Sequence, residues 1–323
     1  MERIKLSIIV PIYNMTSYLL KFVDSFLVQS SNDFEIIFVN DGSTDNSGVI
    51  CDEYCKKYPE LISVVHKDNG GLSSARNAGI DVAKGDFVVF PDPDDWVEPD
   101  YVERFLNLQN EHQVDLVCTG YTIDYDDKQI VPITNDSCLI FSGKEAQKYL
   151  LLPPKMNGFA WNKIYRLDLI KKYNLRFLDD VGTTEDLDFV YRYLKYCERV
   201  CYAPEYKTYH YYQRAGATTR SGFTVHKMNS LHTYEKIMAD TDDVELRRAA
   251  KDELVTTTVN LIWLYENSGC KDTKIKRQLL NSLRDNLKEY LMKSRYGTGR
   301  KIQAVLAACS PKLFCLIKNS IQK

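Results

Sequence analysis

The sequence predicts an α/β fold, with a mostly parallel sheet flanked by helices and a helical C-terminal extension. From residue 6 to about residue 120, short apolar runs rich in β-branched residues alternate with segments of helical period, which is typical of βαβ units. Two of these runs are followed by aspartates, Asp41 directly and Asp92 after one proline, as is common where ligands bind beyond the carboxyl ends of parallel strands. Beyond residue 223 the pattern is almost entirely helical.

The elements of the first half follow from these patterns in order. A strand is expected at residues 6–12, and Thr16 is expected to cap the helix after it, whose apolar positions share one face. The next elements are a strand at 35–40, a helix through Val49 and Tyr54, strands at 61–66 and 87–90 on either side of a helix at 72–83, a helix that opens at Glu98-Pro99-Asp100, and strand candidates at 116–122 and 130–133.

The second half is less regular as far as residue 221. Helices are expected near residues 144–151 and 187–197. The longest helix is expected at residues 244–267, where Gly269 is a suitable stop. With 323 residues, the chain is long enough for one principal domain, here 1–221, and an appended region, here 222–323.

Composition excludes several classes of protein. Lys and Arg number 42 against 44 Asp and Glu, a net charge of -2, which argues against a nucleic-acid binder that relies on a basic face. The nine cysteines form no Cys-x-x-Cys pair and are expected to be reduced, rather than to form disulfides or a zinc site. No signal peptide and no membrane-spanning run is apparent, so a cytoplasmic protein is expected.

Asp92-Pro93-Asp94-Asp95, directly after the strand at 87–90, is the most informative motif. Taken alone, it is also a good turn, and it lacks the glycine and glutamate of a calcium-binding loop. Carboxylates this close repel one another unless a cation lies among them, and oxygen ligands favour Mg²⁺ or Mn²⁺. The apolar strand before the motif favours a metal–diphosphate site. Asp41, which ends the strand at 35–40, is expected in the same cleft, although Asp-Gly is also a common turn pair.

A second segment favours anion binding. In Asn69-Gly70-Gly71-Leu72-Ser73-Ser74-Ala75-Arg76-Asn77, two glycines precede a helix whose free N–H groups attract anions. The spacing matches neither the dinucleotide fingerprint nor a P-loop. Arg76 is suited to pair with phosphate through its planar guanidinium.

Four motifs, in this order and spacing, resemble glycosyltransferase family 2, the bacterial inverting enzymes of GT-A fold that build capsules, exopolysaccharides and O-antigens. They are Val-Pro-Ile-Tyr-Asn at 10–14, Asn-Asp-Gly-Ser-Thr-Asp at 40–45, the segment at 69–77, and Phe-Pro-Asp-Pro-Asp-Asp-Trp at 90–96. The resemblance implies a Rossmann-like catalytic domain with a nucleotide-binding half at 1–121 and an acceptor-side half at 122–221. It also implies a UDP-sugar donor and a Mn²⁺ or Mg²⁺ cofactor.

Site residues are carried over from the resemblance by position. The implied metal ligands are Asp94 and Asp95, and related enzymes often add a late histidine, here His210, which is otherwise an ordinary core residue. Pro91 and Pro93 depart from the family pattern and leave open which aspartate contacts the metal. The implied nucleotide-sugar set is Pro11, Tyr13, Asn14, Asp41, Lys67, Gly70, Arg76, Asp92, Asp94 and Arg214.

The catalytic base is expected in Thr183-Thr184-Glu185-Asp186-Leu187-Asp188, because the family carries a Glu-Asp pair there. Asp186 is the candidate, with Glu185 or Asp188 as substitutes, although acidic residues at a helix start are favourable in any case. Trp161 is either a flat face for the acceptor sugar or a core residue. Arg214 and Arg220 flank a segment that is expected to close over the diphosphate.

The last 36 residues contain eight Lys or Arg and one Glu, interleaved with apolar residues. This tail is either a solvated helix or an interfacial basic helix pair on the inner face of the cell membrane, where it would meet a lipid-linked acceptor. Two rival functions remain at this point, namely a metal-dependent phosphohydrolase and a catalytically silent sugar-nucleotide or glycan-binding module. Oligomerisation, the transferred sugar and the linkage are left open.

Overall fold

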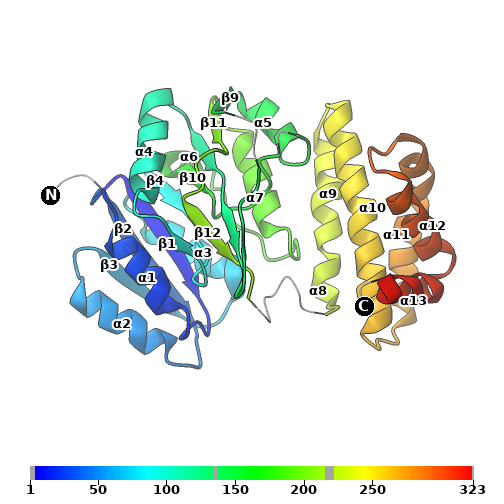
Figure 1. Cartoon of the computed structure of the whole chain (residues 1–323), viewed down its shortest axis with the longest axis horizontal. Helices are drawn as coiled ribbons and strands as arrows, with labels where there is room; N and C mark the ends of the chain where they lie inside the picture. The colour runs from blue at the N-terminus through cyan, green and yellow to red at the C-terminus, as the bar shows by residue number, and fades with distance from the viewer. Residues whose placement is uncertain (1–3, 134–136, 154, 215–221, 322–323) are drawn as a thin grey trace. The chain divides into compact units, whose positions relative to one another are not determined.

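The computed structural model describes residues 4–133, 137–153, 155–214 and 222–321. The chain divides into two compact units (Figure 1). The sheet unit comprises Met1–Asp179 with Glu185–Ala215, and the helical unit comprises Asp180–Thr184 with Gly216–Lys323. The predicted boundary at residue 221 lies in a segment, 215–221, outside the described residues. The same holds for Arg220, and both stay predictions.

In the described part of the sheet unit, the main sheet has eight strands in the order β3-β2-β1-β4-β10-β6-β11-β9, with helices on both faces (Figure 1). The strands β1 to β4 are mutually parallel, and β10 runs antiparallel between β4 and β6. The main strands are β1 (Leu6–Ile12), β2 (Phe34–Asp41), β3 (Ile62–Lys67), β4 (Phe87–Val89), β6 (Leu116–Thr119), β9 (Leu139–Phe141), β10 (Lys163–Arg166) and β11 (Val200–Ala203).

The helices that connect these strands pack their apolar faces on the sheet. Helix α3 lies especially close to β1, because a Cβ added to Gly79 would fall 2.2 Å from Ile9 Cγ2. Helix α1 begins at Leu19 without a side-chain cap, since Thr16 instead donates its hydroxyl to Asp45, so the predicted cap is wrong. The helices are α1 (Leu19–Leu27), α2 (Ser47–Lys57), α3 (Gly71–Val82), α4 (Tyr101–His112), α5 (Gly143–Tyr149), α6 (Leu167–Lys172) and α7 (Glu185–Leu194).

A smaller sheet follows the acidic motif. Its order is β5-β12-β7-β8, from β5 (Trp96–Val97), β12 (Tyr209–Tyr212), β7 (Thr122–Asp124) and β8 (Gln129–Ile130). The expected strand at 116–122 is therefore two strands, β6 and β7, that belong to different sheets. The small sheet brings the end of the unit's chain back beside the acidic motif, because β12 pairs with β5 only a few residues beyond Asp92.

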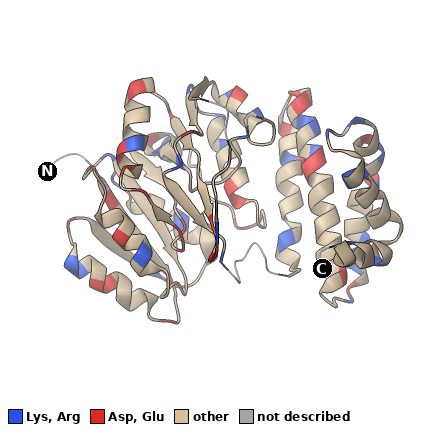
Figure 2. Cartoon of the chain, in the orientation of Figure 1, with Lys and Arg blue, Asp and Glu red and all other residues tan. Residues whose placement is uncertain are grey.

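The helical unit consists, in its described residues, of α8 (Val225–Met228), α9 (Ser230–Asp240), α10 (Val244–Asn267), α11 (Thr273–Lys293), α12 (Thr298–Cys309) and α13 (Pro311–Ile321). Helix α10 has the predicted bounds and is capped by the Asp243 carboxylate, which accepts the N–H groups of Glu245 and Leu246. Both signs of charge occur in both units (Figure 2).

The C-terminal helices expose part of their apolar surface. On α13, which also carries Lys312 and Lys318, Leu316 and Ile321 are 67% and 77% exposed. Among the described residues, no helix is both long enough and apolar enough to span a bilayer. Contact of this tail with a membrane surface stays a prediction.

Candidate active site

The turn after β2 is anchored to the start of α3 by Asp41. Its carboxylate accepts the backbone N–H groups of Gly70, at 3.0 Å, and Gly71, at 2.8 Å, and it pairs with Lys67 Nζ at 2.5 Å. The side chain of Asp41 is only 4% exposed. The first role of this carboxylate is therefore to neutralise the positive helix start and to hold two loops together at the carboxyl edge of the sheet.

The end of β1 lies at the same edge. Pro11 is buried within the strand, whereas the ring of Tyr13 is 46% exposed. Asn14 adopts a φ of 55° and accepts the Thr44 N–H at 2.8 Å, which ties this loop to the turn after β2. Of these three residues, Tyr13 is the one that presents a free aromatic face, as a stacked base requires.

Arg76 joins two segments that are far apart in the sequence. From α3, its guanidinium donates to Asp92 Oδ1 at 3.2 Å and to Asp186 Oδ1 at 2.5 Å, and it lies 5.1 Å from the centroid of the Phe177 ring. Arg76 is 1% exposed. The acidic motif after β4 and the Glu-Asp pair at the start of α7 therefore share one buried cation, as expected for a single site.

Negative charge exceeds positive charge around Arg76. Partial burial raises the pKa of Asp92, and the charges of Asp94 and Asp186 add to this effect against the attraction of Arg76, so that the pKa reaches about 7. Burial and the charge of Asp186 likewise raise the pKa of Glu185 to about 7. Within the described residues, Glu185 Oε2 is buried without a hydrogen-bond partner. Such an excess of acid favours a cation or a proton in the site.

Asp186 is held in place on both sides. Arg76 binds Oδ1, and the backbone N–H of Ala160 donates to Oδ2 at 2.8 Å. Its side chain keeps 19% exposure, so the carboxylate still reaches solvent. Asp188, in contrast, is buried and paired with Arg192, which removes it as a candidate base.

Asp94 and Arg214 form the outer part of the site. Arg214 Nε donates to Asp94 Oδ2 at 2.5 Å, and the guanidinium lies 5.2 Å from the centroid of the Tyr18 ring. Both side chains are partly exposed, at 20% for Arg214 and 16% for Asp94. Arg214 thus lies where a diphosphate beside Asp94 would meet a cation.

Asp95 does not share this position. It is 1% exposed, and it accepts the Tyr209 hydroxyl at 2.5 Å and the Tyr212 N–H at 2.8 Å. Burial, together with the charges of Asp92 and Asp94, raises the pKa of Asp95 well above its usual value. The structure therefore does not support Asp95 as a metal ligand, because both its oxygens tie the motif to β12.

His210 is engaged elsewhere. Its Nδ1 lies 2.9 Å from Asp124 Oδ2 and its Nε2 lies 2.8 Å from Glu98 Oε1, while its ring stacks on Trp96 at a centroid distance of 5.2 Å. Since both nitrogens have partners, His210 has no free ligand atom in this arrangement. The structure does not support the predicted role at the metal.

Trp161 is a core residue. It is 3% exposed and stacks on Tyr209 and Phe159 with centroid distances of 4.6 and 4.9 Å. It has no free face for a sugar ring, so the structure does not support its role as an acceptor platform. Of the two alternatives left open by the sequence, the core interpretation fits.

The sequence alone did not point to two groups that shape the site. One is the Ala160 N–H that holds Asp186, and a backbone donor leaves no signal in residue type. The other is Lys163, which is fully buried and donates to the carbonyl oxygens of Phe159 and Met156. A lysine inside a Trp-Asn-Lys segment was the available signal for the second group.

The acidic residues fit a hard divalent cation that is held partly by the protein and partly by the phosphates of a bound nucleotide. Among the described residues, no three carboxylates come close enough together to enclose an ion by themselves. Asp94, with Asp92 next to it, can offer one or two oxygens, which is the usual number where Mg²⁺ or Mn²⁺ is held together with phosphates.

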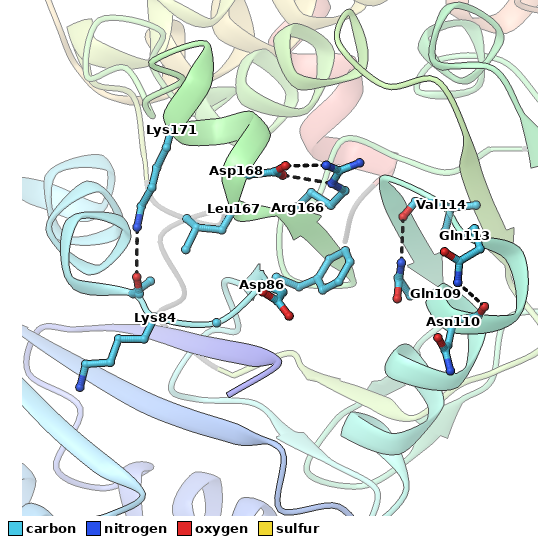
Figure 3. Close-up of a pocket in the computed structure, with 13 residues that line it drawn as sticks. Lys84, Asp86, Gln109, Asn110, Gln113, Val114, Arg166, Leu167, Asp168 and Lys171 are labelled. Atoms are coloured by element: carbon cyan, nitrogen blue, oxygen red, sulfur yellow. Dashed lines mark hydrogen bonds and ion pairs between the residues drawn. The ribbon is translucent and has the colours of Figure 1, made fainter. Parts of the chain in front are cut away.

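A polar cavity of about 640 Å³ lies at the opposite end of the sheet, between the start of β4 and the end of β10 (Figure 3). Its cations are already paired. Arg166 binds Asp168 and Asp115, and Lys171 donates to the Ala83 carbonyl. Nothing in its lining requires a ligand.

Comparison with known proteins identifies the class. Residues 7–173, about half of the chain, match the model of "Glycosyl transferase family 2". The chain belongs to glycosyltransferase family 2, and the predicted family is confirmed.

Two relatives in bacteria illustrate the extent of the likeness. EpsJ of Bacillus subtilis, an uncharacterized glycosyltransferase, is 36% identical over 60% of this chain and 57% of its own length. The poly(ribitol-phosphate) beta-glucosyltransferase of Bacillus spizizenii is 27% identical over 84% of this chain and 42% of its own. Among the relatives matched first, the alignment covers from 26% to 61% of their length.

Two solved structures confirm the fold. Residues 1–349 of S. aureus TarS, in complex with UDP-GlcNAc, superpose with a TM-score of 0.65 at 22% identity, over 88% of this chain and 81% of that one. A mannosyltransferase from Pyrobaculum calidifontis, in complex with GDP-Man and Mn²⁺, gives 0.56 at 14% identity, over 95% and 88%. The GT-A-like α/β sheet with a helical C-terminal region is as predicted.

Proposed function

We propose that this chain is an inverting glycosyltransferase that moves a hexose or N-acetylhexosamine from a UDP-sugar to a hydroxyl of a lipid-linked glycan during surface polysaccharide synthesis. The proposal rests on the two ion pairs of Arg76, because they join the acidic motif to the Glu-Asp pair in one partly open acidic site. Membership of the family supplies the reaction class.

In this proposal the donor lies along the carboxyl edge of β1, β2 and β4. Tyr13 stacks on the base, Asp41 and the start of α3 lie beside the ribose, and Arg214 pairs with the diphosphate. The complex of TarS with UDP-GlcNAc supports a UDP-sugar as the donor class.

Asp94, with Asp92 beside it, would hold Mn²⁺ or Mg²⁺ in this site. The ion would neutralise negative charge on the departing diphosphate. Oxygen donors suit these ions, and the complex of the mannosyltransferase with Mn²⁺ supports the choice.

Asp186 acts as the base that removes the proton of the acceptor hydroxyl as its oxygen attacks the anomeric carbon. Arg76 and the Ala160 N–H orient this carboxylate, and its remaining exposure leaves room for the hydroxyl. Glu185 is the alternative base, since its pKa is raised to about 7 and one of its oxygens has no partner among the described residues.

The acceptor side is proposed from the relatives. One of them is named for glucosyl transfer to poly(ribitol phosphate), and this supports a polymer of the cell surface as the acceptor. The exposed apolar residues of α13 are compatible with a lipid-linked acceptor presented at a membrane surface.

The variant Asp186→Asn tests the base. It should bind UDP-GlcNAc with unchanged affinity by calorimetry in the presence of Mn²⁺, and it should slow sugar transfer by roughly 10²–10⁴-fold. Transfer is measured as UDP release from UDP-glucose, UDP-galactose and their N-acetyl forms with a panel of alkyl glycosides as acceptors.

Asp168→Asn is the matched control, because Asp168 also lies in the first turn of a helix and also pairs with an arginine. It should leave transfer unchanged. Wild-type rates in Asp186→Asn would contradict the assignment, and wild-type protein that binds UDP-GlcNAc without any transfer would indicate a binding module instead.

A further inference from the structure

Outside the acidic site, three ligand-bearing side chains gather in the sheet unit. Cys138 Sγ lies 3.2 Å from Cys201 Sγ and 3.4 Å from His112 Nε2. All three ligand atoms lie within 4.8 Å of one another, and this is the one such group of three found among the described residues. Both cysteines are free thiols.

The three residues come from segments that the fold brings together. His112 ends α4, Cys201 is the second residue of β11, and Cys138 directly precedes β9. In the antiparallel pairing, Cys201 lies opposite Ile140. Cys138, two residues before Ile140, therefore faces the same side of the sheet as Cys201. The ligands thus meet where the last strand of the sheet passes the end of α4.

The donor set is soft and its spacing suits one small ion. Two thiolates and an imidazole are ligands typical of Zn²⁺. With bonds of about 2.3 Å to sulfur and 2.0 Å to nitrogen, tetrahedral neighbours are separated by roughly 3.5–3.8 Å. The contact between Cys138 Sγ and His112 Nε2, at 3.4 Å, is close to the value for sulfur and nitrogen, whereas the two sulfurs, at 3.2 Å, would have to move apart by roughly 0.6 Å to hold the ion.

The surroundings are acidic and partly open. Glu205 Oε1 accepts the backbone N–H of Cys138 at 3.0 Å, and Glu111 Oε1 lies 4.0 Å from His112 Nε2. Cys138 and His112 are partly exposed, whereas Cys201 is buried, so an ion can enter from one side. Burial raises the pKa of both thiols, and they therefore stay protonated unless a cation replaces their protons.

We propose that His112, Cys138 and Cys201 bind one Zn²⁺ ion, with Glu205 or water as the fourth ligand. Binding forms two zinc–thiolate bonds and one zinc–imidazole bond, and it releases the two thiol protons to solvent. The ion fastens β9, which pairs only with β11 among the described strands, to the end of α4. This site is independent of the sugar-transfer site and has a structural role.

The expected soft site is distinguished from the acidic site by its sulfur ligands. Purified full-length protein, reduced and stripped of metal, is titrated with Co²⁺ as a spectroscopic substitute for zinc. The wild type should develop the near-ultraviolet thiolate-to-cobalt absorption, and one equivalent of Zn²⁺ should displace it. Asp94→Asn should behave identically, since no thiolate lies in the acidic site.

The variants His112→Ala and Cys138→Ser should lose the absorption and bind one zinc fewer per chain by elemental analysis. The matched control is Cys309→Ser, which removes an exposed free thiol outside the cluster and should retain both signals. Zinc should also raise the melting temperature of the wild type and not that of Cys138→Ser.

Wild-type protein without thiolate absorption and with the same zinc content as Cys138→Ser would overturn the proposal. A disulfide between Cys138 and Cys201 would also overturn it. The evidence would be a mass two hydrogens lower in unreduced protein, a Cys138–Cys201 cross-link in its peptides, and no metal uptake after reduction. Circular dichroism of each variant identifies loss of folding. If Cys138→Ser is unstable, the decision rests on His112→Ala, since His112 lies at a helix end.

Discussion

Two arginines in the sheet unit each bridge two aspartates, and they differ in position, in exposure and in the charge around them. Arg76, at the carboxyl edge, binds Asp92 and Asp186 and is 1% exposed. Arg166, at the amino edge, binds Asp115 and Asp168 and is 39% exposed. The first lies among carboxylates that exceed it in charge, and the second lines a polar cavity (Figure 3).

The two clusters differ in the direction in which they shift the pKa of an aspartate. The hydrogen bond from Arg166 lowers the pKa of Asp168, as in an ordinary satisfied pair. At the other edge, the pKa of Asp92 is raised to about 7 even though Arg76 contacts it. The surroundings of Asp92 at the carboxyl edge thus favour a proton or a cation, whereas Asp168 at the amino edge is stabilised as an anion.

The largest expected contrast is in stability when each arginine loses its charge. Arg76→Met should lower the free energy of unfolding by about 3–5 kcal/mol, because it leaves buried carboxylates without their cation. Arg166→Met should cost no more than about 1 kcal/mol, since Arg166 and Asp168 are exposed and the buried Asp115 keeps the N–H groups of Glu198 and Arg199. Urea denaturation of both variants in the same buffer makes the comparison, and equal losses would show that the two clusters do not differ as described.

A second contrast separates two neighbouring aspartates within the acidic motif. Asp95→Ala should cost about 2–3 kcal/mol, because it leaves the Tyr209 hydroxyl and the Tyr212 N–H unsatisfied. Asp94→Ala should cost about 1 kcal/mol and should reduce the affinity for UDP in the presence of Mn²⁺. A variant at position 95 with normal stability and weakened metal binding would restore Asp95 as a ligand.

A smaller effect is expected in the pH dependence of stability. The pKa of Asp92 is raised from 3.8 to about 7, so its neutral form favours the folded state, and this contribution is lost as pH rises through that range. Asp92→Asn cannot ionise. Its free energy of unfolding, relative to the wild type, should therefore increase between about pH 5 and pH 7 and level off above.

Asp168→Asn is the control for this measurement. The pKa of Asp168 is lowered, so its contribution is present above the usual value and is lost only as pH falls below it. The difference between this variant and the wild type should be flat over the same range. The same slope in both variants would contradict the assigned difference between the two edges.

Much of the fold could be predicted because local pattern decides it. The strand at residues 6–12 and the helix at 244–267 have the expected bounds, since uninterrupted apolar runs and a regular helical period leave few alternatives. The insertion of β10 antiparallel between β4 and β6 could not be predicted, because it pairs segments more than 40 residues apart without any local signal.

In the candidate site, too, some features could be predicted from the sequence and others could not. The rule that ligands bind beyond parallel strand ends placed Asp92 and Asp94 correctly at the carboxyl edge. It could not show which carboxylate turns inward, because this depends on β12 of the small sheet, whose Tyr209 hydroxyl and Tyr212 N–H donate to Asp95. The cysteines were expected to lack a metal site on spacing alone, and His112, Cys138 and Cys201 share no sequence spacing that would indicate one.

The central claim is that the acidic motif at the carboxyl edge holds a divalent ion together with the diphosphate of a nucleotide. Isothermal calorimetry with UDP, with and without Mn²⁺, on wild type and Asp94→Asn tests it most directly. The account predicts wild-type affinity that rises by at least roughly tenfold with Mn²⁺, equivalent to about 1.4 kcal/mol, and no such gain in Asp94→Asn. Affinity for UDP that is the same with and without the ion in both proteins would contradict it.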